Sequence, residues 1–188
     1  MLNQQLISPL ITPLQHGQTV EEALLQMEDQ GVSHLPLLKD GHLEAVIAES
    51  DLLDADQRTL VETLPVYAAP IAVAADNHFL SAAAAMLGRQ LSAVPVVAAE
   101  NEYVGTITEH TLLQQLAQLT GAMGAGALVV IEMEPHQLSI SELSKLVETN
   151  DAHITQFNTS IHPDTGMLLA TLRINKQEIS DIVATLQR

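Results

Sequence analysis

The chain has 188 residues, of which 47% are apolar and 2% aromatic, with 23 acidic residues, 7 basic residues and no cysteine. This length suffices for one large domain or two small ones, and the lack of cysteine excludes disulfides and thiolate metal sites. The acidic charge argues against nucleic-acid binding, which needs lysine and arginine to displace phosphate counterions.

The longest apolar run, Val66–Ala75, is interrupted by Pro70 and is far shorter than the roughly 20 residues of a membrane span. The N-terminus lacks the basic and apolar regions of a signal peptide. We therefore expect a cytoplasmic protein.

The first predicted helix carries Val20, Ala23, Leu24 and Met27 at helical spacing. Thr19 precedes it, with Glu22 three residues on, which predicts a capping box. Short β-type runs follow at 35–38 and 43–48, with a turn at 39–42 between them. A second helix is predicted to begin near Glu49.

The same order recurs about 59 residues later. A helix with Phe79, Ala82, Ala83 and Met86 on one face is followed by β-type runs at 94–98 and 103–108 and by a helix starting near Glu109. The internal repeat therefore predicts two strand–helix–strand–strand–helix units in about the first 118 residues.

Residues 120–127, TGAMGAGA, hold three of the nine glycines and no charge. A helix precedes this segment and a strand follows it, which is the reverse of the order in a phosphate-binding loop. The composition therefore favours a flexible hinge or a helix end.

The remaining chain repeats the element order with different residues. We predict a strand at 128–133, a helix after the N-cap Ser139, an extended stretch through Ile154 and Phe157, a turn at 163–166, a strand at 167–174 and a helix to Leu186.

The segments TVEEALLQM…VSHLPLL…VIAESDLL and HFLSAAAAML…LSAVPVV…GTITEHTLL resemble tandem CBS domains, which form Bateman modules. The resemblance covers about residues 7–118, and the tail resembles an ACT domain, as in acetoin-utilisation-type CBS–CBS–ACT proteins. It implies an α+β fold: two CBS-like βαββα repeats packed as a pseudo-twofold pair, followed by a ferredoxin-like βαββα domain without its last strand. The predicted boundaries are 1–65 and 66–119 for the repeats, 120–127 for the hinge and 128–188 for an ACT-like domain. Because its last strand is missing, we expect this domain either to be truncated or to complete its sheet in another way. The stretch 134–137 also lacks the glycine at which an ACT effector approaches the backbone.

The resemblance also implies an adenosine- or AMP-type ligand between the repeats, with its ribose held by the motif G-h-[ST]-x-x-D. Here the motif is split: the first copy keeps Asp51, and the second keeps Gly105 and Thr108. Asp51 and Thr108 fit local helix capping equally well. The candidate ligand-binding residues are Ile11, Thr12, Leu35, Pro36, Ala48, Asp51, Ile71, Val94, Pro95, Thr108 and Thr111.

The repeats carry only three basic residues against fifteen acidic ones, so the sequence favours adenosine or a monophosphate over ATP. No nucleophile motif, phosphate loop or metal-ligand spacing is present, and we expect neither catalysis nor a metal. His34 and His110 are expected near the cleft, where they would contact a ligand or confer pH sensitivity. The predicted function is that of a regulatory, homodimeric ligand sensor, and the alternative is a ligand-free dimerisation scaffold.

Overall fold

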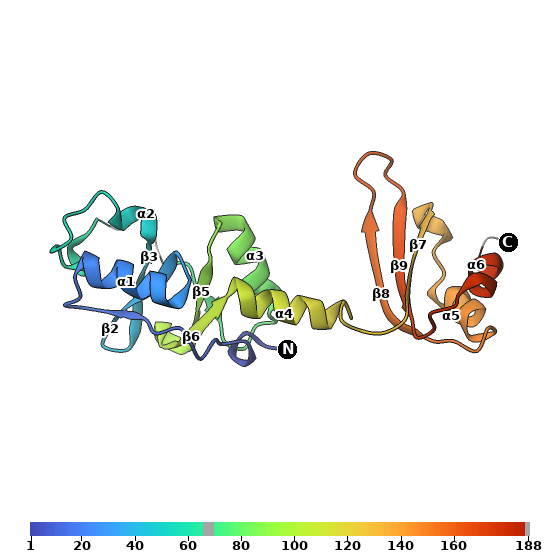
Figure 1. Ribbon diagram of the computed structural model, residues 1–188, viewed down its shortest axis with the longest axis horizontal. Helices are drawn as coiled ribbons and strands as arrows, with labels where there is room; N and C mark the ends of the chain where they lie inside the picture. Colours follow the sequence, from blue (N-terminus) through green and yellow to red (C-terminus); the bar gives the residue numbers. More distant parts are fainter. Residues whose placement is uncertain (66–69, 187–188) are drawn as a thin grey trace. The chain divides into compact units, whose positions relative to one another are not determined.

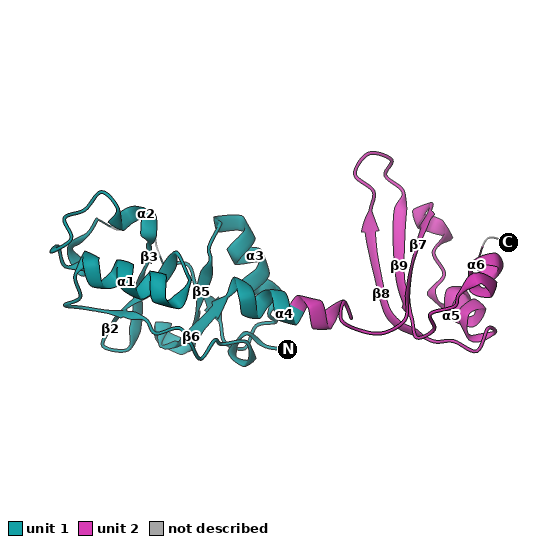
Figure 2. Cartoon of the chain, viewed as in Figure 1, with its two compact units in different colours: residues 1–115 teal, residues 116–188 magenta. Residues whose placement is uncertain are grey.

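The computed structural model describes residues 1–65 and 70–186 of the chain. The start of the predicted second repeat and of the apolar run Val66–Ala75 falls at 66–69, outside the described residues, as do 187–188. The chain divides into two compact units, residues 1–115 and 116–188 (Figure 2). Within its described part, no helix is both long and apolar enough to cross a membrane.

The first half of the first unit contains one βαββα repeat (Figure 1). Its elements are η1 (Asn3–Gln5), β1 (Leu14–Gln15), α1 (Val20–Gln30), β2 (His34–Lys39), β3 (His42–Ala48), α2 (Glu49–Leu52) and η2 (Val61–Thr63). The sheet has the order β1-β2-β3, with β1 parallel and β3 antiparallel to β2.

The second half repeats this plan and confirms the predicted duplication. Its elements are β4 (Val73–Ala74), α3 (Leu80–Arg89), β5 (Ala93–Val97), η3 (Ala99–Asn101), β6 (Tyr103–Thr108) and α4 (Glu109–Leu119). The sheet order is β4-β5-β6, with β4 parallel and β6 antiparallel to β5. Both copies have an irregularity at the same place, between Leu37 and Leu38 and between Val96 and Val97.

Local sequence signals explain the ends of α1. The backbone N–H of Glu22 donates to Thr19 Oγ1 at 3.3 Å and that of Thr19 donates to Glu22 Oε2 at 2.8 Å, which confirms the capping box. The helix ends at Gly31 in the left-handed conformation, with φ of 66°. Gln90 occupies the equivalent position after α3, with φ of 53°.

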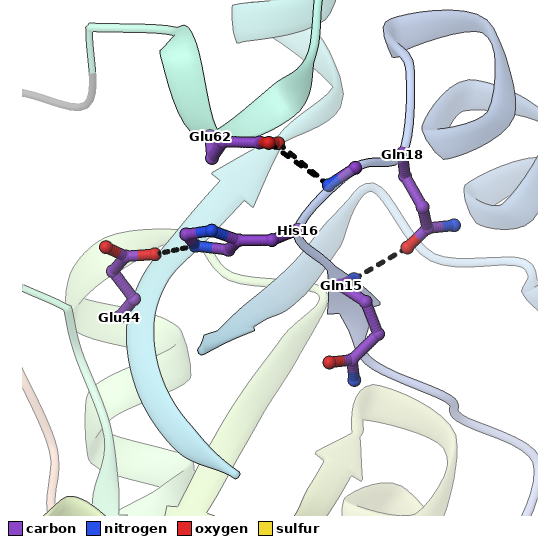
Figure 3. A network of polar contacts seen from close by, with 6 residues as sticks. Gln15, His16, Gln18, Glu44 and Glu62 are labelled. Atoms are coloured by element: carbon purple, nitrogen blue, oxygen red, sulfur yellow. Dashed lines mark hydrogen bonds and ion pairs between the residues drawn. The ribbon is translucent and has the colours of Figure 1, made fainter. Parts of the chain in front are cut away.

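Figure 3 shows the polar contacts around β1 and the turn that follows it in the first repeat. The carboxylate of Glu62, in η2, accepts the backbone N–H of Gly17 at 3.1 and 3.2 Å, and His16 pairs with Glu44 of β3. A hydrogen bond from the backbone N–H of Glu62 itself, assisted by Gly17 and His16, lowers the pKa of this carboxyl group. The polar contacts join the β1–α1 turn to η2 and β3.

The apolar face predicted for α3 and its N-cap Phe79 points into the core. Phe79, Ala82 and Met86 are almost completely buried. Ala82 and Ala83 are buried inside the repeat, so these small residues of α3 do not offer a surface for close helix contact between protomers.

The second unit has the element order predicted for an ACT-like domain, β7 (Ala127–Met133), η4 (Pro135–Gln137), α5 (Ile140–Glu148), β8 (Ile154–Ile161), β9 (Leu168–Ile174) and α6 (Ser180–Leu186). The antiparallel sheet has the order β7-β9-β8. Val147 and Ile182 from the two helices pack with Ile174 of β9. One face of the sheet therefore carries both helices, which supports a ferredoxin-like βαββα arrangement.

Within the second unit, the glycine-rich segment contacts Arg173 of β9. The guanidinium Nη1 donates to the carbonyl oxygen of Gly124 at 2.9 Å, and Gly121 lies against the same side chain. Gly126 has φ of 119°, and a Cβ there would lie 2.0 Å from the carbonyl oxygen of Ile174. Glycine is required at this position because any side chain would overlap β9.

Candidate functional site

A cavity of about 580 Å³ opens in the first unit and is called here the Thr108 cavity. Its walls come from four parts of the chain, residues 8–11, residues 30–32, Ser92, and the start of α4 at residues 108–111 with Gln114. Its size falls in the range of about 300–1,000 Å³ that is usual for small-molecule sites. It brings together three of the predicted ligand-binding residues, Ile11, Thr108 and Thr111.

The N-terminal wall of this cavity, residues 8–11, follows Ile7, which packs against Gly105 of β6. A Cβ on Gly105 would lie 2.4 Å from Cγ2 of Ile7, so the missing side chain is what lets Ile7 pack there. The next residue, Ser8, donates its backbone N–H to the carbonyl oxygen of Thr106 at 2.8 Å. Gly105 therefore fixes the segment that carries Ile11 into the cavity.

The two threonines at the start of α4 cap the helix reciprocally. Thr111 donates its backbone N–H to Thr108 Oγ1 at 3.2 Å, and Thr108 donates its own to Thr111 Oγ1 at 3.1 Å. The Thr111 hydroxyl donates to the carbonyl oxygen of Thr108 at 3.0 Å. The hydroxyl hydrogen of Thr108 has only the longer 3.3 Å contact with Thr111 Oγ1, so it is the donor most readily turned toward a ligand.

Asp51 makes the equivalent contact in the first copy. Its Oδ2 accepts the backbone N–H of Ala48 at 3.1 Å, at the start of α2. The predicted helix-start role of Asp51 is thus observed. Neither Ala48 nor Asp51 lines the Thr108 cavity, so the structure separates the two halves of the split motif.

The other predicted residues lie outside this cavity. Thr12 is exposed and bonded to Gln30, whose side chain accepts the Thr12 N–H at 3.0 Å. Leu35 and Val94 have no exposed surface and belong to β2 and β5, two strands in mutual contact, and Pro36 and Pro95 are buried beside them. Ile71 is half-buried and does not line the Thr108 cavity.

A second cavity, of about 650 Å³, adjoins the first and was not predicted from the sequence. We call it the Glu49 cavity; it is lined by apolar residues of α1, by Glu28, by residues 31–33, and by Glu49, Ser92 and Glu109. Gly31, Val32, Ser92 and Glu109 line both cavities. The sequence signal that points here is the pair Ser33 and Ser92, which occupy the same position in the two copies.

These serines form a polar cluster between the repeats with His34. Ser33 donates its backbone N–H to Ser92 Oγ at 2.9 Å, and Ser92 donates its own to Nδ1 of His34 at 3.3 Å. Because Nδ1 accepts, the neutral ring carries its proton on Nε2. Burial lowers the pKa of His34, although the carboxylates of Asp51 and Glu109 act in the opposite direction. The cluster thus favours a neutral histidine.

His110, the other histidine predicted near the cleft, does line the Thr108 cavity, and its Nε2 lies 3.0 Å from Nε2 of Gln114. No group of three or more histidine, aspartate or glutamate side chains is placed to hold a metal ion within residues 1–65 and 70–186.

Comparison with known proteins agrees with this architecture. The CBS domain family model matches residues 7–58 and 66–118. A solved CBS domain pair/ACT domain protein from Thermotoga maritima is 22% identical, with 63% of this chain and 98% of that chain covered and a TM-score of 0.55. The cytosolic domain of the Mg²⁺ channel MgtE in complex with ATP is 26% identical, with 61% and 48% covered and a TM-score of 0.50. CBSX2 in complex with AMP is 19% identical, with 62% and 96% covered and a TM-score of 0.50.

Proposed function

This chain belongs to the CBS domain family, and on that premise we propose that it is a cytoplasmic, non-catalytic regulatory protein that binds an adenosine-type ligand in the Thr108 cavity. The observation that carries the proposal is the cavity itself, which joins the apolar Ile11 to the hydroxyl groups of Thr108 and Thr111. CBS domain pairs are generally regulatory modules, and the related folds solved with AMP and ATP support a nucleotide-type ligand.

The lining of the cavity suits a nucleoside. Ile11 and Val32 offer apolar surface to a base, while the Thr108 hydroxyl is a donor for a ribose oxygen. Glu109 supplies an acceptor at the same wall. Such a site gains its free energy from apolar burial and a few placed polar groups, as small-molecule sites generally do.

The charge around the cavity disfavours a polyphosphate. The first 119 residues carry three basic and fifteen acidic residues, and no lysine or arginine is among the described residues that line the Thr108 cavity. We therefore expect adenosine or AMP to bind more tightly than ATP.

Titration calorimetry with adenosine, AMP and ATP tests this function. Thr108→Val keeps the shape of the side chain and removes the hydroxyl group. We expect the affinity for adenosine to fall by about tenfold at most, because a neutral hydrogen bond contributes about 1 kcal/mol. Thr159→Val, on the exposed part of β8 in the second unit, is the matched control. Failure of all three compounds to bind would refute the proposal.

Asp51 does not line the Thr108 cavity, and we propose it as the ribose contact of a separate half-site in the first copy of the motif. One of its carboxylate oxygens, Oδ2, holds the start of α2. A carboxylate can accept from both hydroxyl groups of a ribose, so the remaining oxygen gives Asp51 a role beyond capping.

A ligand that binds two states of the module with different affinity would shift their populations, and we propose that this shift is passed to the ACT-like unit or to a partner. We also propose a homodimer, because the first unit exposes Leu25, Leu87 and Leu113 on its helices and Leu53 directly after α2. Light scattering that gives a mass near 20.2 kDa at micromolar concentration would rule the dimer out.

The second candidate function is a ligand-free dimerisation scaffold. The observation that favours it is that Asp51 and Thr111 already satisfy backbone groups at helix starts. This candidate predicts dimers in solution without any change of melting temperature on addition of nucleosides, whereas a ligand of the native state raises that temperature with its concentration.

A further inference from the structure

The N-terminal segment, residues 1–8, is bonded to the second repeat and is called here the N-terminal strap. Asn3 donates its backbone N–H to the carbonyl oxygen of Asn77 at 2.9 Å, in the turn between β4 and α3. In return, the backbone N–H of Phe79 donates to the carbonyl oxygen of Met1 at 3.1 Å. The strap therefore precedes the first repeat in sequence but is held by the second.

The first repeat is closed in the same manner by the segment that precedes the second repeat. Leu60 pairs with Thr19 at the start of α1, as Leu2 pairs with His78 shortly before α3. Each repeat is thus completed by residues that come before the other repeat in the sequence. The two repeats are therefore interlocked, and a change in the strap acts on both of them.

Asn3 is the polar anchor of the N-terminal strap, and it has no exposed surface. Its Nδ2 donates to the carbonyl oxygen of Ala74 at 2.7 Å and to Oγ of Ser81 at 3.0 Å. Its Oδ1 is buried without a hydrogen-bond partner among the described residues. Burial of an amide costs free energy unless it is bonded, so the two contacts of Nδ2 are what hold this side chain against β4 and α3.

The other end of the strap leads directly into the Thr108 cavity. Ser8 is buried and donates its backbone N–H to the carbonyl oxygen of Thr106 in β6. Ile11, three residues later, is buried in the core of the first repeat. Pro9 and Leu10 between them are exposed. This wall of the cavity therefore depends on the anchors at its two ends, one in each repeat.

We propose that Asn3 is a positioning residue for the Thr108 cavity, because it anchors the strap that carries the wall formed by residues 8–11. Asn3 itself lines neither of the two cavities. It acts through the strap, in which Ile7 packs against Gly105 just before Ser8. As regards a bound ligand, this inference rests on the proposed nucleoside function and deepens it, whereas the anchoring of the strap is a property of the free protein.

Native-state hydrogen exchange on the full chain tests the anchor without a ligand, because the exchange of a bonded N–H reports local opening. The probe is the backbone N–H of Ser8. Asn3→Ala removes both side-chain contacts, and we expect Ser8 to exchange about 5- to 100-fold faster, since two neutral hydrogen bonds are lost. Ser81→Ala removes one of them, and we expect an acceleration of about 2- to 10-fold.

Gln4→Ala is the matched control in the same strap. Gln4 is exposed, and its backbone N–H donates to the carbonyl oxygen of Ala75 at 3.1 Å, a contact that the substitution keeps. Exchange at Ser8 is expected to stay within about twofold of that of the unmodified protein. The N–H groups of β5 report the opening of the whole second repeat, and Asn3→Ala should accelerate them less than Ser8.

The same measurement with adenosine tests the coupling between the strap and the cavity. If binding requires the anchored strap, the strap can open only after adenosine has left. At a free adenosine concentration of about 100 times its dissociation constant, exchange at Ser8 should then slow by up to about a hundredfold. Unchanged exchange at Ser8 with adenosine bound would separate the strap from the site and overturn the positioning role of Asn3.

The outcomes without ligand decide the anchor. If Asn3→Ala leaves exchange at Ser8 unchanged, Asn3 does not anchor the strap. If Asn3→Ala accelerates Ser8 and β5 by the same factor, Asn3 stabilises the second repeat as a whole. Either result overturns the inference. If adenosine does not bind to the unmodified protein, the proposed function fails, and exchange in the free protein still decides whether Asn3 holds the wall in place.

Discussion

Replacement of Gly105 by alanine tests whether close packing with Ile7 holds the wall of the Thr108 cavity. The new Cβ would lie 2.4, 2.9 and 3.0 Å from three side-chain carbons of Ile7, well inside van der Waals contact. Overpacking of this kind costs about 1–3 kcal/mol. Gly105 lies in β6 and needs no left-handed backbone, so alanine is acceptable there once Ile7 is shortened.

A double-mutant cycle of Gly105→Ala and Ile7→Ala isolates this packing term. We expect Gly105→Ala alone to lower the free energy of unfolding of the first unit by about 1–3 kcal/mol, and to be neutral or slightly stabilising in the Ile7→Ala background, because alanine loses less conformational entropy than glycine. Urea unfolding followed by circular dichroism gives the four free energies. The explanation fails if the cost of the alanine is the same in both backgrounds.

Three further predictions concern single positions. Asp51→Asn keeps the shape and removes the charge, and a nucleoside bound at that residue should weaken by about ten- to a hundredfold; equal calorimetric affinity would leave Asp51 only its contact with Ala48. Gln90→Gly should stabilise the first unit by about 1 kcal/mol or less in urea unfolding, because Gln90 occupies the left-handed position that Gly31 fills in the other copy; a loss of stability would contradict this. Burial lowers the pKa of His34 below 6.5 in the folded state, so the contribution of His34 to stability is complete above pH 6.5 and is lost as the pH falls through the folded value. In the variant His34→Gln, the free energy of unfolding should therefore depend less on pH below 6.5. If the curves of the variant and the unmodified protein run parallel, His34 is not the cause.

The repeat allowed most of the fold of the first unit to be predicted from sequence. The bounds predicted for β6, 103–108, agree with the structure, because a run of β-type residues there is followed directly by a helix start. The buried face of α3 was also predicted, since Phe79, Ala82 and Met86 follow helical spacing. Each of these signals is contained within about ten residues.

The site was harder to predict because its walls come from distant segments. Ile11 and Thr108 were named from the family resemblance, and the structure places both in one cavity. Leu35 and Val94 were named in the same way, but they are buried where β2 and β5 meet. The apolar sequence of a strand that is buried on both faces does not reveal whether its neighbour is a ligand or another strand. The Glu49 cavity depends on Glu28, Glu49 and Glu109, which only the packing of the two repeats brings together.

The glycine-rich segment shows the same limit. Its composition indicates flexibility, and nothing local reveals that Arg173, about fifty residues later, donates to its backbone. A glycine-rich segment can nevertheless be held by hydrogen bonds, because glycine also occurs where another strand approaches the backbone closely, as Ile174 approaches Gly126.

The matching irregularities in the two sheets mean that the two helix starts are carried on equivalent backbones. The breaks at Leu37/Leu38 and Val96/Val97 are 59 residues apart and fall at the same point of the same strand pair. A break of this kind changes which residues face which side of a strand, so the two copies change face at the same point. Exchanging Ala48 and Asp51 for Thr108 and Thr111 would therefore place one helix start on a backbone that matches it.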